Sequence, residues 1–111
     1  MRATCELSVV IPVYGCEPCL RPLHRRVSDE LQKITPHFEI IFVDDCSTDG
    51  GWDAVRDIAS QDPHVRAFRL SRNFGQQAAI AAGMEKSRGR WTVVMDCDLQ
   101  DPPEVIEMLY A

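Results

Sequence analysis

The stretch "EIIFVDDCSTDGGWDAVRDIASQ" (residues 39–61) contains one complete strand–turn–helix unit and decides the fold. It begins with a continuous apolar run, which is typical of a strand that is covered on both faces. A loop with two aspartates and two glycines follows, and the segment after it has the apolar spacing of a helix. We therefore predict a strand over 39–43 and a helix over 52–61.

The same unit repeats on both sides of this stretch. Short β-branched runs predict further strands over 7–13, 65–70 and 91–95, and apolar residues at three- and four-residue steps predict helices over 20–34 and 76–87. Alternation of strand and helix is typical of right-handed β-α-β units, whose strands are parallel. The predicted fold class is α/β, with three α/β/α layers around a mainly parallel, Rossmann-like sheet.

Length, composition and charge set limits on the function. With 111 residues, 45% of them hydrophobic and 26% charged, the chain has the size and composition of one globular domain. A net charge of -5 without runs of Lys or Arg argues against a nucleic-acid partner. No stretch approaches the roughly 18 apolar residues of a membrane-spanning helix, so we expect a cytoplasmic chain.

The cysteines are odd in number and scattered, which favours reduced thiols over a disulfide framework. They are Cys5, Cys16, Cys19, Cys46 and Cys97. Cys16 and Cys19 form a lone C-x-x-C, without the second pair that a structural zinc site needs. All except Cys5 follow predicted strands, and we note their loops as an adventitious site for a soft ion such as Zn²⁺.

The unusual residues of the chain follow the predicted strands, where open α/β sheets bind their ligands. The four loops cover residues 12–18, 44–51, 71–77 and 96–104. Helix capping explains the residues 47–49 and also Asp101, Pro102 and Glu104. It leaves four carboxylates unexplained, those of Asp44, Asp45, Asp96 and Asp98. Because clustered carboxylates repel one another, we expect a cation or a hydrogen-bonding ligand to be their partner.

Asp96 and Asp98 stand two residues apart in "VVMDCDLQDPPE" (93–104). In an extended chain both side chains point to one side and Cys97 to the other. Two carboxylates offer hard oxygen ligands to Mg²⁺ or Mn²⁺, with a bound diphosphate completing the coordination. Taken alone, so short a pattern is equally compatible with a solvated acidic turn.

Four segments in order carry a family resemblance: "VVIPVYGCE", "VDDCSTDG", "SRNFGQQAAIAAGM" and "VVMDCDLQDPPE". Together they resemble the N-terminal, nucleotide-binding half of family 2 glycosyltransferases with the GT-A fold. The last two segments are most similar to the branch that transfers a sugar to polyprenyl phosphate, such as dolichol-phosphate mannose synthase and the undecaprenyl-phosphate glycosyltransferases. The resemblance covers nearly the whole chain.

The resemblance implies a role for each matching residue. The loop around the base and ribose would hold Pro12, Tyr14 and Glu17, although this chain has Y-G-C-E where relatives often have Y-N-E. Asp45, with Asp44 beside it, would accept a hydrogen bond from the base, and Arg72 would lie near the phosphates. Asp96 and Asp98 match the D-x-D motif, whose metal-bound carboxylates serve catalysis, and Gln100 matches a further residue of that metal site.

The implied reaction is inverting transfer of a hexose from UDP or GDP to a lipid phosphate, with Mg²⁺ or Mn²⁺ stabilising the leaving diphosphate. Residues 1–111 would then be the N-terminal nucleotide-sugar-binding part, without the acceptor-binding part. We expect the complete protein at the cytoplasmic face of a membrane.

The family's strand order, 3-2-1 with the fourth strand beside the first, would leave residues 91–95 at an edge of the sheet. An unpaired apolar edge promotes association. We therefore predict a two-fold homodimer formed through residues 91–95 and 103–110.

Two other functions fit parts of the sequence. One is a non-catalytic nucleotide-binding or assembly module. The other is a haloacid-dehalogenase-type phosphatase, which also places D-x-D after an apolar strand but has Thr or Val where Gln100 stands here.

Overall fold

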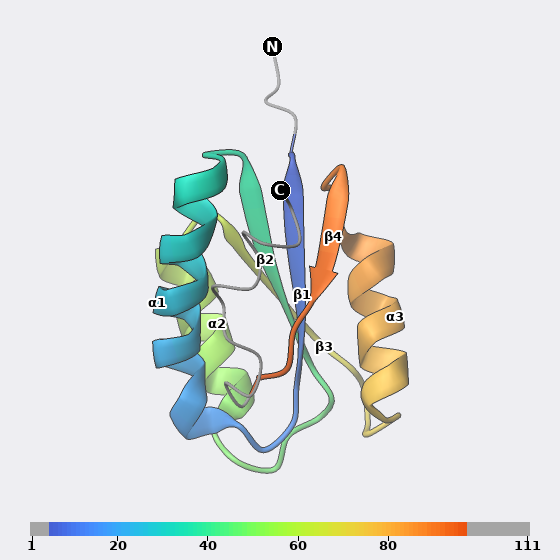
Figure 1. Ribbon diagram of the computed structural model, residues 1–111. Helices are drawn as coiled ribbons and strands as arrows, with labels where there is room; N and C mark the ends of the chain where they lie inside the picture. The colour runs from blue at the N-terminus through green and yellow to red at the C-terminus, as the bar shows by residue number, and fades with distance from the viewer. Residues whose placement is uncertain (1–4, 98–111) are drawn as a thin grey trace.

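The computed structural model describes residues 5–97, in which strands and helices alternate along the chain (Figure 1). The elements are β1 (Leu7–Val13), α1 (Glu17–Ile34), β2 (Phe38–Asp44), α2 (Gly51–Gln61), β3 (Val65–Arg69), α3 (Gln76–Lys86) and β4 (Trp91–Val94). The predicted elements are confirmed. Helix α1 begins three residues earlier than predicted, because proline is well suited to the first helical turn and Pro18 stands there. None of the helices in this range is both long and apolar enough to cross a membrane.

The sheet has the strand order β3-β2-β1-β4, and every pairing in it is parallel. This is the order that the family resemblance implies. Helices α1 and α2 cover one face of the sheet and α3 covers the other (Figure 1). The predicted three-layer α/β/α architecture is therefore confirmed.

Residues of the central strands alternate between the two faces, and both faces are buried. Ile40 and Phe42 belong to the core beneath α1 and α2, whereas Ile41 and Val43 face α3. Each such side chain contributes roughly 1.5–3 kcal/mol when fully buried. Helix α3 lies close against the sheet because Gly83 has no side chain, and a Cβ atom there would collide with Val10.

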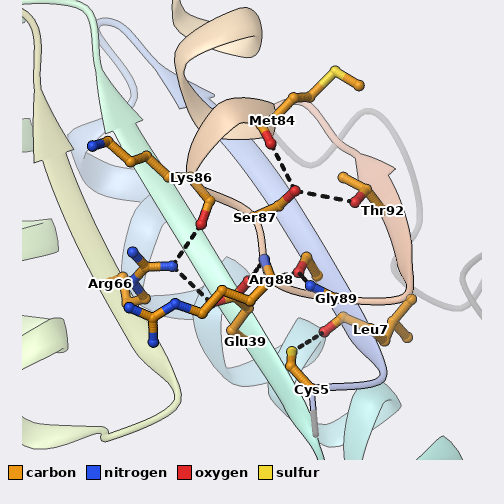
Figure 2. Close-up of polar contacts among 11 residues, drawn as sticks. Cys5, Leu7, Glu39, Arg66, Met84, Lys86, Ser87, Arg88, Gly89 and Thr92 are labelled. Atoms are coloured by element: carbon orange, nitrogen blue, oxygen red, sulfur yellow. Dashed lines mark hydrogen bonds and ion pairs between the residues drawn. The ribbon is translucent and has the colours of Figure 1, made fainter.

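A buried polar cluster fastens the turn between α3 and β4 to the amino ends of the strands (Figure 2). The Glu39 carboxylate accepts hydrogen bonds from Ser8 Oγ (2.6 Å), the Arg88 backbone N–H (2.6 Å) and the Arg66 guanidinium (3.0 Å). Burial disfavours ionisation of Glu39, but these three donors outweigh it and hold its pKa below the ordinary value. The Gly89 N–H completes the cluster by donating to Ser8 Oγ (2.7 Å).

Candidate functional site

A cleft of about 360 Å³ lies at the carboxyl ends of the strands, the end opposite to the Glu39 cluster. All four loops that follow strands contribute to it, as the sequence predicts. Its lining residues are Pro12, Val13, Tyr14, Cys16, Asp45, Asn73, Gly75, Gln76, Asp96 and Cys97.

The structure brings together four of the predicted site residues, Pro12, Tyr14, Asp45 and Asp96. The Tyr14 ring is half exposed beside the cleft, so one of its faces is open to a ligand. Three other predicted residues, Glu17, Asp44 and Arg72, lie outside the lining of the cleft. The predicted metal ligands Asp98 and Gln100 lie outside the described residues.

Asp45 holds the start of α3 against the end of β2. Its carboxylate is only 4% exposed, and its two oxygens accept the backbone N–H groups of Phe74 (2.8 Å) and Gly75 (3.0 Å). Gly75 has a φ of 101°, a conformation that suits glycine and turns the chain into the helix. The Asp45 carboxylate is thus fixed in position at the wall of the cleft.

Asp44 is fully buried and points away from the cleft, into the turn after β2. It accepts hydrogen bonds from Ser47 N–H (3.0 Å) and Ser47 Oγ (2.5 Å), and Arg69 Nε lies 3.3 Å from it. Cys46, with a φ of 60°, lets the chain fold back over Asp44. The expectation that Asp44 and Asp45 need an external partner is therefore wrong: backbone amides and a guanidinium on β3 supply partners that sequence spacing does not reveal.

Asp96 follows β4 and faces the first residue of α3. Gln76 Nε2 donates to Asp96 Oδ1 at 3.1 Å, and both side chains line the cleft. The neutral amide orients the carboxylate without neutralising its charge. Cys97 is buried in the core on the opposite, α1 and α2 side, which confirms that it points away from Asp96. Sequence reasoning singled out the loop 71–77 but assigned no role to Gln76, which carries no charge.

A disulfide joins Cys16 to Cys97, with 6.1 Å between the two Cα atoms. The prediction of reduced thiols is wrong for this pair and holds for the free cysteines, Cys5, Cys19 and Cys46. The partners are 81 residues apart, and the pairing becomes visible only when β4 lies beside β1. Within residues 5–97, no three His, Cys, Asp or Glu side chains are placed to hold a metal ion.

The remaining predicted residues, Arg72 and Glu17, lie outside the lining of the cleft. The Arg72 guanidinium lies over the exposed Phe74 ring, 4.6 Å from its centroid. The Glu17 backbone N–H donates to Asp49 Oδ2 (3.3 Å), and Asp49 Oδ1 accepts the Gly51 N–H at the start of α2 (2.9 Å). Asp49 thus belongs to the turn before α2, as predicted, but the N-cap position is Gly50 and has no side-chain cap. The predicted capping box at residues 101–104 lies outside the described residues.

The chain matches the family model for glycosyl transferase family 2 over residues 8–111. Among curated relatives, the undecaprenyl-phosphate 4-deoxy-4-formamido-L-arabinose transferase of Aeromonas hydrophila subsp. hydrophila is 41% identical over 104 residues. That match covers 93% of this chain and 32% of the relative. The chain therefore spans about a third of the length of the curated relatives it matches.

Two solved structures share the fold. TarS of S. aureus, residues 1–349, in complex with UDP has a TM-score of 0.68 and 25% identity, and the match covers 84% of this chain and 27% of TarS. The mannosyltransferase PcManGT from Pyrobaculum calidifontis, solved with GDP-Man and Mn²⁺, has a TM-score of 0.75 and 22% identity over 90% of this chain and 34% of that protein. Both neighbours share the α/β fold of this chain, and PcManGT is a mannosyltransferase, in agreement with the predicted fold class.

Proposed function

The chain belongs to glycosyl transferase family 2, and on this premise we propose that it is the nucleotide-sugar-binding part of an enzyme that transfers a hexose from UDP or GDP to a polyprenyl phosphate. The observation that carries the proposal is the cleft at the carboxyl ends of the strands. There Asp45 from the end of β2, Asp96 from the end of β4 and the half-exposed Tyr14 line one space.

We assign the base and ribose to the side of the cleft formed by Pro12, Tyr14 and Asp45. Each oxygen of a carboxylate has two lone pairs, so Asp45 can accept a base N–H while keeping its bonds to the backbone of 74 and 75. Asp44 lies outside the cleft lining and is itself fully buried, so this role falls to Asp45. The Tyr14 ring offers a flat apolar face to the base. UDP in the TarS complex supports a nucleoside diphosphate as the ligand.

We assign the diphosphate to the side of the cleft formed by Asp96 and the start of α3. Asp96, together with Asp98 and Gln100 in the part of the chain beyond the described residues, would hold Mg²⁺ or Mn²⁺. The donor set fits a hard cation, because carboxylate and amide oxygens are the ligands that such ions prefer. When bound, the ion would act as a Lewis acid on the departing diphosphate. Gln76 orients Asp96 for this role, and Arg72 on the neighbouring loop would offset phosphate charge.

The name of the Aeromonas relative supports a lipid phosphate as the acceptor. A phosphate oxygen is already anionic, so it can attack the anomeric carbon with little help from a general base, and attack opposite to the leaving diphosphate inverts the configuration. The acceptor-binding part would lie outside residues 1–111. A lipid acceptor also places the complete protein at a membrane surface.

The phosphatase alternative is wrong, because the family match is to a glycosyl transferase family. Asp96, the first residue of the D-x-D segment, follows β4, the fourth strand along the described chain.

Calorimetry with UDP and GDP, each with Mn²⁺ and with EDTA, tests the proposal. We expect one of the two nucleotides to bind, and its affinity to fall with EDTA and in Asp96→Asn. Asp53→Asn is the matched control, because Asp53 is 76% exposed on α2, away from the cleft. Equal affinity with EDTA and with Mn²⁺ would contradict the metal assignment, and no binding of either nucleotide would contradict the proposal as a whole.

Catalysis is tested separately from binding. Residues 1–111, and separately a longer chain that extends past residue 111, are incubated with a short polyprenyl phosphate. The donor is a nucleotide diphosphate sugar that contains the preferred base. Sugar appearing on the lipid supports the transferase. Nucleotide binding without transfer by the continued chain would favour the non-catalytic module instead.

A further inference from the structure

Two loops that form opposite parts of the cleft are joined covalently. Cys16 belongs to the loop after β1, two residues beyond Tyr14, and Cys97 directly follows Asp96. Both cysteines line the cleft, and their sulfur atoms are bonded. Cys19, in the first turn of α1, and Cys46, on the loop after β2, lie at the same end of the sheet, yet they are outside the lining and carry free thiols.

We propose that Cys16 and Cys97 form a reversible thiol–disulfide pair, and that its oxidation state determines how firmly Asp96 is held against the loop after β1. The first half of this proposal concerns only the two cysteines. The second half rests on the proposed function, because it assumes that the segment around Asp96 binds a metal–diphosphate.

The interconversion is a thiol–disulfide exchange with a small disulfide such as glutathione disulfide. Cys16 stands at the N-cap of the 18-residue helix α1 and lines the cleft, where a small disulfide can reach its thiol. Attack by Cys16 forms a mixed disulfide and releases one glutathione thiolate. Attack by Cys97 on the Cys16 sulfur then expels the second, so two protein thiols are oxidised while one small disulfide becomes two thiols.

The disulfide is a principal tether of the chain just after β4. Directly after β4, the Met95 backbone N–H donates to Val10 O on β1 (3.0 Å). Beyond it, the Gln76–Asp96 hydrogen bond holds one side of the chain, and the Cys16–Cys97 bond holds the other. Of these two side-chain links within residues 5–97, reduction would leave the Gln76–Asp96 hydrogen bond, so the backbone at Asp96 and Cys97 would gain freedom.

This freedom has a direct consequence for binding. A segment that is ordered before the ligand arrives loses less entropy on binding than a mobile one, and the ligand affinity is correspondingly higher. The oxidised chain, in which the carboxylate of Asp96 is held in place from both sides, should therefore bind a metal–nucleotide more tightly than the reduced chain.

Thiol counting tests the pair without any nucleotide. The chain is equilibrated in glutathione buffers of increasing oxidising strength, denatured, alkylated and weighed by mass spectrometry. Of the five cysteines, we expect all five to be alkylated in reducing buffer and three in oxidising buffer, since two of them pair. Cys16→Ser and Cys97→Ser should each show four alkylated thiols in every buffer.

Cys19→Ser is the matched control, since it removes a free thiol near the cleft. This variant should show four alkylated thiols in reducing buffer and two in oxidising buffer. If the unchanged chain still shows five alkylated thiols in the most oxidising buffer, Cys16 and Cys97 do not form the proposed pair. If Cys97→Ser also loses two thiols on oxidation, other cysteines form the disulfide, which likewise overturns the proposal.

Calorimetry with Mn²⁺ and UDP or GDP tests the second half. We expect the reduced chain and Cys97→Ser to bind the nucleotide roughly threefold to tenfold more weakly than the oxidised chain. Cys19→Ser should retain this redox dependence. Equal affinities, or tighter binding by the reduced chain, would overturn the coupling. If neither form binds a nucleotide, the proposed function and the coupling both fail, while the thiol count still decides the pair.

Discussion

Replacing Asp45 by alanine tests how the cleft is built and how it binds. The carboxylate is nearly inaccessible and accepts two backbone N–H groups, from Phe74 and Gly75. A hydrogen bond to a charged group contributes roughly 1.5–3 kcal/mol to stability. When the carboxylate is removed, the two loop amides can bond to water instead and recover part of this free energy. We therefore expect Asp45→Ala to lower the free energy of unfolding by about 2–4 kcal/mol.

A loss of this size should leave Asp45→Ala folded in the absence of urea. Domains of this size are stable by about 5–15 kcal/mol, and each kcal/mol shifts the Tm by roughly 4–8 °C. The free energy of unfolding of Asp45→Asn should lie between those of Asp45→Ala and the unchanged chain. The asparagine amide keeps one acceptor oxygen but turns an NH₂ group toward the second backbone N–H. Asp53→Ala, on the exposed face of α2, should change the free energy of unfolding by less than about 0.5 kcal/mol.

Urea unfolding followed by circular dichroism gives these free energies, and calorimetry gives the matching affinities. If Asp45 also binds the base, Asp45→Ala should weaken nucleoside and nucleoside-diphosphate binding by similar factors, equivalent to about 1.5–3 kcal/mol. Equal stability of Asp45→Ala and Asp53→Ala would refute the structural reasoning. An effect on the diphosphate form alone would reassign Asp45 to the metal site.

Three further predictions concern acid stability, metal positioning and association. The pKa of Glu39 lies below its ordinary value of 4.5, so its stabilisation is complete above about pH 4.5 and is lost as the pH falls through the lower, folded-state pKa. Glu39→Gln should therefore flatten the acid side of the plot of urea midpoint against pH, and an unchanged slope would contradict this. Gln76→Ala should weaken Mn²⁺-dependent nucleotide binding several-fold and leave nucleoside binding unchanged, as measured by calorimetry; equal losses for both ligands would indicate a purely structural role. In residues 5–97, β4 is an edge strand with Trp91 57% exposed, so the chain should dimerise in sedimentation equilibrium and Trp91→Lys should shift it toward monomer. A monomer at high concentration, with rapid hydrogen exchange over 91–95, would contradict that prediction.

The fold could be predicted from the sequence because each parallel strand is covered on both faces. A strand such as 7–13 is then apolar throughout, and the helices between strands keep a clear apolar spacing. The start of α1 was less accurately predicted, because the apolar spacing begins at Leu20, whereas the helix begins at Glu17 before Pro18.

Site residues could be predicted from the sequence only where they directly follow a strand, because that place alone brings them to the carboxyl edge of the sheet. Tyr14, Asp45 and Asp96 are of this kind, and the structure brings all three to the cleft. The Gln76–Asp96 hydrogen bond and the Cys16–Cys97 bond were missed, because they depend on which strands and helices become neighbours. The ion pair between the buried Asp44 and the partly exposed Arg69 was missed for the same reason. An acidic cluster that looks unpartnered in sequence can thus be satisfied within the fold.

The central claim is that a divalent metal and a nucleotide bind together in the cleft at the carboxyl ends of the strands. Backbone amide NMR of this 12.5 kDa chain with a nucleotide and substoichiometric Mn²⁺ tests it most directly, because the ion broadens the signals of nearby amides. We predict broadening at Asp45, Gly75 and Asp96, with the signals of Ser8 and Glu39 at the opposite end of the strands preserved. Broadening around Glu39, or an unchanged spectrum at saturating nucleotide, would contradict the claim.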